Sequence, residues 1–122
     1  MIPVDQTTFG FPGGNCFSAC VASLLECPID GVPYFMGSTR WWEDFERWLL
    51  PLGYYPILVP IDGTWAPPGL HILSGTSDRG ARHSVVARGR EIVHDPHPDR
   101  SGLATRDRTI VIVPLDPAEG FR

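Results

Sequence analysis

The order of helix-forming and strand-forming segments is the feature that most constrains the fold. Up to Pro51 and Gly53, the sequence favours two helices, at residues 14–26 and 40–50. Beyond that point it changes to short runs rich in Val and Ile between Gly and Pro turns, which predict strands at 54–60, 70–74, 83–87, 91–95 and 109–115. Helices followed by strands, without βαβ alternation, predict an α+β fold with N-terminal helices packed on a C-terminal antiparallel sheet.

The size and composition of the chain are those of a folded domain. It has 122 residues, of which 43% are apolar and 11% aromatic, so we expect one compact domain over residues 1–122. No stretch approaches the length of a membrane span, and neither end has a basic segment leading into a long apolar run, which favours a soluble, cytoplasmic protein with no membrane partner. A net charge of −4 argues against a nucleic-acid partner. The sequence leaves the oligomeric state open.

The second predicted helix has one apolar face. Its large side chains recur at helical spacing, which places that face in the core, and Ser38 or Thr39 is the expected cap; the apolar positions are 41, 42, 45, 48 and 49.

Cys16 lies at the predicted start of the first helix. Gly13, Gly14 and Asn15 precede it, and we expect Asn15 to cap the helix. Free amide groups and the helix dipole at this end favour a thiolate, which is the nucleophilic form of cysteine. The alternative is that Cys16 is a small buried hydrophobic residue, as free cysteines often are.

The cysteine count and spacing favour a reduced protein. Three cysteines cannot form a complete disulfide framework, and Cys16 and Cys20 are one helical turn apart. The His94-x-x-His97 spacing is a poor match to zinc sites, so we expect no metal and no cofactor. A metal site made by Cys16, His83 and His94 or His97 remains an alternative.

A thiolate that attacks a carbonyl needs a base, and the base needs a group that orients it. His83 and Asp95 are the strongest candidates, because they lie on the two strands of one predicted hairpin. If the hairpin closes between Ala87 and Glu91, His83 faces Asp95; if Arg88 pairs with Glu91, the two side chains lie on opposite faces. The sequence does not decide between these turns.

The basic residues are unevenly distributed. All ten are arginines, and eight of them lie from Arg79 onward. They either form a rim that attracts an acidic substrate or partner, or are a solvated surface. Arg79, Arg82 and Trp65, which lies in a predicted loop at 63–68, are the candidate substrate-binding residues.

The motifs around these candidates resemble the papain-like cysteine peptidase superfamily, most closely the double-glycine leader peptidase domains that process bacteriocins. The matching segments are Cys16-Phe17-Ser18-Ala19-Cys20-Val21-Ala22, His83-Ser84-Val85-Val86 and Val93-His94-Asp95-Pro96. The resemblance implies a papain-like fold, with Cys16 as nucleophile, His83 as base and then acid, and Asp95 as the group that orients the imidazole.

The family also has a glutamine six residues before the cysteine, whose amide stabilises the oxyanion. That position is Gly10 here, so Gln6 and Asn15 are the candidate donors, together with the Cys16 amide.

These expectations together describe an acyl-transfer enzyme without a cofactor. We expect hydrolysis of a peptide or isopeptide bond through a Cys16 thioester, with a peptide or protein substrate of acidic character. The alternatives are an acyltransferase of the same fold and a non-catalytic binding module. The identity of the substrate does not follow from the sequence.

Overall fold

The computed structural model describes residues 1–10, 13–61, 63 and 65–119. Both predicted helices are present, as α1 (Cys16–Leu25) and α2 (Trp41–Leu49). Short 3₁₀ turns follow them in the connections and near the end of the chain: η1 (Ile29–Gly31), η2 (Phe35–Gly37), η3 (Leu50–Leu52) and η4 (Pro117–Glu119). No helix in these ranges is long and apolar enough to cross a bilayer.

The expected helix caps are wrong. The Asn15 side chain makes no capping bond; its Oδ1 instead accepts the amides of Thr7 and Thr8, at 2.9 and 3.0 Å. Asn15 therefore ties the N-terminal arm, residues 1–10, to the start of α1. At α2 the cap position is Arg40, not Ser38 or Thr39. The Ser38 hydroxyl accepts the backbone N–H of Arg40, which lies just before the first residue of the helix.

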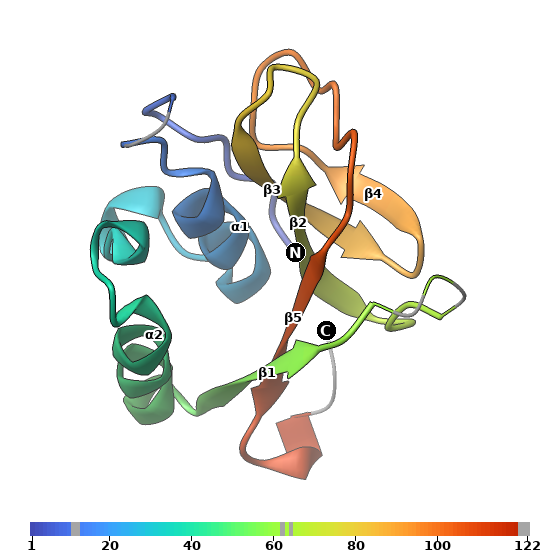
Figure 1. Cartoon of the computed structure of the whole chain (residues 1–122). Helices are drawn as coiled ribbons and strands as arrows, with labels where there is room; N and C mark the ends of the chain where they lie inside the picture. The colour runs from blue at the N-terminus through green and yellow to red at the C-terminus, as the bar shows by residue number, and fades with distance from the viewer. Residues whose placement is uncertain (11–12, 62, 64, 120–122) are drawn as a thin grey trace.

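All five predicted strands are present and form one antiparallel sheet in the order β1-β5-β2-β3-β4. Their bounds are β1 (Tyr54–Val59), β2 (Leu70–Thr76), β3 (Arg82–Arg88), β4 (Glu91–His94) and β5 (Arg108–Pro114). Helix α1 packs on β2 and β3, and α2 packs on β1, so both helices lie on one side of the sheet (Figure 1). The predicted α+β class is confirmed.

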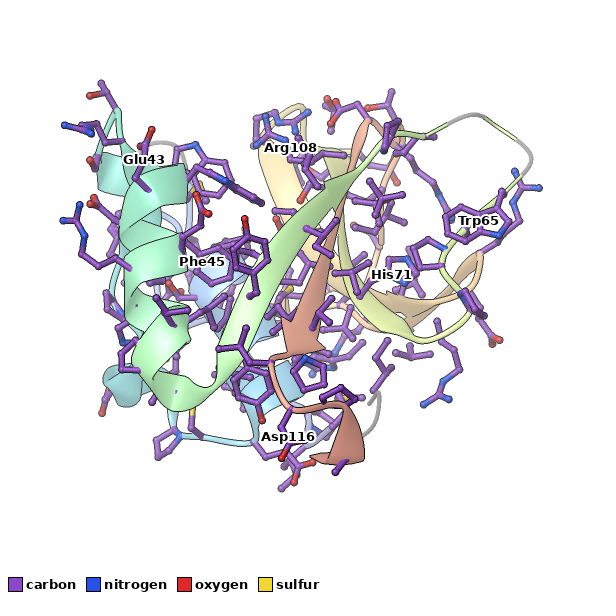
Figure 2. The ribbon with its side chains drawn as sticks, turned by 90° about the horizontal axis from the view of Figure 1, so that it is seen from below. Glu43, Phe45, Trp65, His71, Arg108 and Asp116 are labelled. Carbon is purple, nitrogen blue, oxygen red and sulfur yellow. The ribbon has the colours of Figure 1, made fainter. Side chains whose placement is uncertain are left out.

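The core between the helices and the sheet is aromatic. Phe45 of α2 is fully buried and points toward the sheet (Figure 2), with the rings of Phe17 and Phe35 at 5.1 and 5.2 Å. Leu49 is also fully buried, whereas the tryptophans of α2 are only partly buried. The predicted apolar face of α2 therefore does face the core, and its edge remains open to solvent.

A smaller apolar cluster lies on strands β2, β3 and β4. Leu73, Val85 and Ala87 are buried there against Ile92 and Leu103. Leu103 belongs to the long connection between β4 and β5, so this packing holds that connection against the sheet. Asp95 lies at the start of the same connection, and its position therefore depends on this cluster.

Candidate active site

Cys16 is the first residue of α1 and lines a pocket of about 480 Å³. His83 of β3 and Gln6 of the N-terminal arm line the same pocket. The thiol is partly exposed, whereas Cys20, one turn further along α1, is fully buried. The helix start thus presents Cys16 to a cavity that could hold a ligand.

The expectation that the helix start makes Cys16 acidic is wrong. Burial raises the pKa of its thiol, and hydrogen bonding from Ser84 and from the Phe17 and Cys16 amides lowers it only in part. Desolvation disfavours the charged form more than these few donors favour it. Cys16 is therefore a neutral thiol at neutral pH and needs a base in order to react.

His83 and Asp95 are joined by a hydrogen bond of 2.7 Å between Nε2 and Oδ1, and both side chains are buried. The β3-β4 turn pairs Arg88 with Glu91, which is the closure that would separate the two residues. A β-bulge prevents this separation. Ala87 pairs with Ile92, whereas Val86 pairs with His94, so one residue of β4 has no partner on β3. The extra residue, Val93, shifts the register by one and returns Asp95 to the face of His83.

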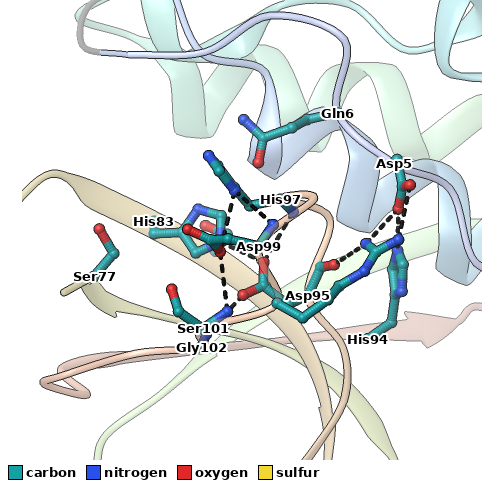
Figure 3. Close-up of polar contacts among 12 residues, drawn as sticks. Asp5, Gln6, Ser77, His83, His94, Asp95, His97, Asp99, Ser101 and Gly102 are labelled. Carbon is teal, nitrogen blue, oxygen red and sulfur yellow. Dashed lines mark hydrogen bonds and ion pairs between the residues drawn. The ribbon is translucent and has the colours of Figure 1, made fainter. Parts of the chain in front are cut away.

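Asp95 accepts three hydrogen bonds (Figure 3). Besides His83, its Oδ1 accepts the His97 amide at 2.9 Å, and its Oδ2 accepts the Gly102 amide at 2.7 Å. Burial alone would raise the pKa of Asp95, but these donors outweigh it and the pKa is lowered. Asp95 is therefore a fixed carboxylate. Gly102 has φ 77, which favours glycine, and so its amide can reach Oδ2.

The carboxylate fixes the tautomer of His83. Because Asp95 Oδ1 can only accept, Nε2 carries the proton and Nδ1 of the neutral ring carries a lone pair. No group in the described part of the chain is hydrogen-bonded to Nδ1. Burial lowers the pKa of His83, and Asp95 offsets this only in part. The ring is thus neutral at neutral pH and can act as a base.

The two oxyanion candidates differ in position. Gln6 is 7% exposed and lines the pocket; its Nε2 donates to Thr8 O at 2.9 Å, and its Oε1 is buried without a partner. In the view of Figure 3, the side-chain amide of Gln6 lies above His83 and His97. Asn15 is not among the described pocket residues, and its Nδ2 donates to Thr7 Oγ1 at 2.8 Å. Only Gln6 is therefore placed to meet a ligand.

The N-terminal arm holds Gln6 in place through contacts with the connection after β4. The backbone N–H of Gln6 donates to Pro96 O at 3.1 Å, and Asp5 forms a bidentate ion pair with Arg100 at 2.6 and 2.9 Å. The arm thus closes over the loop that carries Asp95. Gln6, although not at the spacing of the glutamine in the resembled peptidases, lines the pocket because the arm is held in this way.

Of the three candidate substrate-binding residues, two line the pocket. Arg79 pairs with Asp99 at 2.6 Å, and Arg82 forms a bidentate pair with Asp107. Trp65 is 54% exposed, is not among the described pocket residues, and lies on the far side of the molecule from α2 (Figure 2). Both predicted arginines of the pocket are thus paired with carboxylates.

The pocket is also lined by residues that were not among the predicted substrate-binding residues, among them Trp41, His97 and Arg108. Trp41 was assigned to the apolar face of α2, and only its place at the edge of that face distinguishes it. His97 follows the Asp95-Pro96 pair by one residue, and its ring lies 6.2 Å from that of His83. Arg108 is one of the eight arginines from Arg79 onward, but the sequence could not single it out, because its position depends on the pairing of β5 with β2.

All three cysteines are free. Within the described ranges, no three His, Cys, Asp or Glu side chains are grouped so as to hold a metal ion. His94 and His97 have other partners: His94 Nε2 lies 3.0 Å from Val4 O, and His97 Nδ1 accepts the Asp99 amide at 3.1 Å.

No protein-family model, curated protein or solved structure matches this chain. The papain-like resemblance therefore rests on the motifs around Cys16, His83 and Asp95.

Proposed function

We propose that this protein is a papain-like cysteine acyl-transfer enzyme that hydrolyses a peptide or isopeptide bond. The observation that carries the proposal is that His83 is anchored through Nε2 to a buried carboxylate while its ring and the Cys16 thiol line one pocket. Nucleophile, base and orienting group are the three parts that covalent acyl transfer requires.

In the proposed reaction, His83 Nδ1 takes the thiol proton as the Cys16 sulfur bonds to the substrate carbonyl carbon. The second Nε2 hydrogen of Gln6 and the Cys16 amide stabilise the oxyanion. His83 then gives its proton to the leaving amine as the carbon–nitrogen bond breaks, which leaves a Cys16 thioester. Water attacks this thioester, with His83 again as base, and releases the acid and the free thiol.

The pKa directions favour deprotonation during attack over a preformed ion pair. Burial raises the pKa of Cys16 and lowers that of His83, so both groups are neutral in the resting site. Charge separation is then delayed until the oxyanion forms, when Gln6 and Asp95 can stabilise the two new charges.

The experiment uses p-nitrophenyl acetate, which acylates thiols without a requirement for substrate recognition. We expect a stoichiometric burst of nitrophenolate at pH 7, with the acetyl group located on Cys16 by mass spectrometry. Cys16→Ser and His83→Ala should abolish the burst. Cys27→Ala is the matched control, because Cys27 is also free and partly exposed but lies outside the pocket, and it should retain the burst. Equal acetylation of Cys16 and Cys27 would contradict the proposal.

The raised pKa of Cys16 favours a second candidate, a non-catalytic module that uses the same pocket to bind a peptide. This candidate gives no burst and keeps its ligand affinity in the Cys16→Ala variant. An acyltransferase would show the burst and would pass the acetyl group to an added amine faster than to water.

A further inference from the structure

The pocket next to Cys16 is basic although the protein is acidic. Three arginines line it, Arg79, Arg82 and Arg108, and none of the described residues that line it is an aspartate or glutamate. The whole chain has a net charge of −4. The described lining of this cavity therefore carries arginines and no carboxylate, although the chain as a whole is acidic.

Two of these three arginines are already paired with a carboxylate. Asp99 and Asp107 occupy the guanidinium groups of Arg79 and Arg82. Arg108 has no carboxylate partner among the residues that the structure describes; its charge lowers the pKa of Asp107 as a smaller contribution behind the Arg82 hydrogen bond.

Arg108 lies over an aromatic ring, and no hydrogen bond of its guanidinium is formed within the described part of the chain. Its guanidinium carbon lies 5.4 Å from the centre of the Trp41 ring. A cation–π contact does not use the N–H donors of a guanidinium, which can therefore bind a carboxylate. The contact also restrains the side chain, so a ligand that binds it orders less of the protein.

Trp41 contacts the residue that follows Cys16, and Arg108 is linked through Ser74 to the residue that follows His83. The Trp41 ring lies 5.6 Å from that of Phe17, the residue after the nucleophile. Arg108 pairs across the sheet with Ser74, whose hydroxyl lies 2.8 Å from that of Ser84, the residue after the base. Arg108 therefore lines the same pocket as Cys16, next to residues that contact the neighbours of the proposed nucleophile and base.

From this we infer that the pocket selects acyl substrates that carry a carboxylate side chain close to the scissile bond, with Arg108 as the residue that binds it. The aromatic wall of Phe17, Tyr34 and Trp41 would hold the neighbouring apolar part of the substrate. This inference rests on the proposed function, because it identifies the substrate class of the same site. It also transfers the substrate-binding role from Arg79 and Arg82 to Arg108.

The test uses peptidyl chloromethyl ketones, which alkylate a thiolate: the Cys16 sulfur bonds to the methylene carbon and chloride leaves. Three pairs of probes carry Glu or Gln at the first, second or third residue from the reactive group. We expect one Glu probe to inactivate Cys16 about tenfold faster than its Gln partner, the ratio that 1.4 kcal/mol produces. Arg108→Met keeps the aliphatic contact with Trp41 and should bring this ratio to one, whereas Arg108→Lys should retain part of it. Arg88→Gln, which removes an exposed arginine outside the pocket, should leave the ratio unchanged.

A second measurement does not depend on catalysis. The same peptides, as unreactive amides, are titrated onto the Cys16→Ala protein while the arginine Nε–H signals are followed by NMR. We expect the Arg108 signal to shift with the Glu peptide and not with its Gln partner. The inference would be overturned if the Glu and Gln probes inactivated Cys16 at equal rates in all three pairs. It would also be overturned if the Glu-to-Gln rate ratio were unchanged in the Arg108→Met variant. If neither probe alkylates Cys16, the proposed function fails, and the titration still decides whether the pocket binds carboxylates.

Discussion

Asp95→Asn is the substitution that most directly tests the described site. The carboxylate accepts from His83 and the His97 amide at Oδ1 and from the Gly102 amide at Oδ2, and all of these partners are donors. Asparagine has one accepting oxygen and one NH₂ group. In either orientation, the NH₂ group faces at least one buried N–H, so a donor is left without an acceptor.

The size of the effect follows from these contacts. A hydrogen bond to a charged group contributes about 1.5–3 kcal/mol, and a buried donor left unpaired costs about 1–3 kcal/mol. We therefore expect Asp95→Asn to lower the free energy of unfolding by about 3 kcal/mol at pH 7. Loss of the charge-assisted bond to the His83 imidazolium should slow acylation of Cys16 by about 10- to 100-fold, which corresponds to the same 1.5–3 kcal/mol.

The stability difference should also depend on pH, with a definite sign. The pKa of Asp95 is lowered in the folded protein from an ordinary value of 3.8, so its contribution is complete above that value and is lost as the pH falls through the folded pKa. The wild-type and Asp95→Asn proteins should therefore approach each other in stability at low pH.

The assay is urea unfolding of both proteins at pH 7 and below pH 4, together with the nitrophenyl acetate burst. Asp99→Asn is the matched control, because it removes a carboxylate from the same connection at an exposed site and should have a much smaller effect on stability. The reasoning fails if Asp95→Asn is as stable as Asp99→Asn at pH 7, or if the loss of stability is unchanged at low pH.

Three further predictions concern the framework around the site. Burial lowers the pKa of both His71 and His83 from 6.5, so the unfolded chain binds protons that the folded chain does not; the melting temperature should fall as the pH drops below about 6.5, and His71→Phe should reduce that slope. A Cβ on Gly75 would lie 1.8 Å from a backbone oxygen of the connection before β5, so Gly75→Ala should prevent native folding by circular dichroism, while Gly31→Ala, with open space at its Cβ, should fold normally. Phe45→Ala should lower the free energy of unfolding by about 3–5 kcal/mol in urea titrations, because it empties the centre of the aromatic core; a loss below 1 kcal/mol would contradict that placement.

The sequence alone was sufficient for the α+β class and for the approximate positions of both α-helices and of the five strands. Those features depend on short-range signals: the apolar spacing around Phe45, the Gly and Pro residues that interrupt regular structure, and the β-branched runs of the second half. The motifs also identified the residues that the structure brings together, since Cys16 and His83 share one pocket and His83 is bonded to Asp95.

Only the tertiary structure decided how those residues interact. The extra residue Val93 sets which face of the hairpin carries Asp95, and a single-residue shift of this kind leaves no mark in strand propensity. Contacts between distant parts of the chain place Gln6 in the pocket and Asn15 outside it, and they pair two arginines while leaving Arg108 free. The expected acidity of Cys16 is wrong for the same reason: a helix start is visible in the sequence, but the burial that raises the pKa of the thiol arises only when the chain folds and α1 packs on the distant strands β2 and β3.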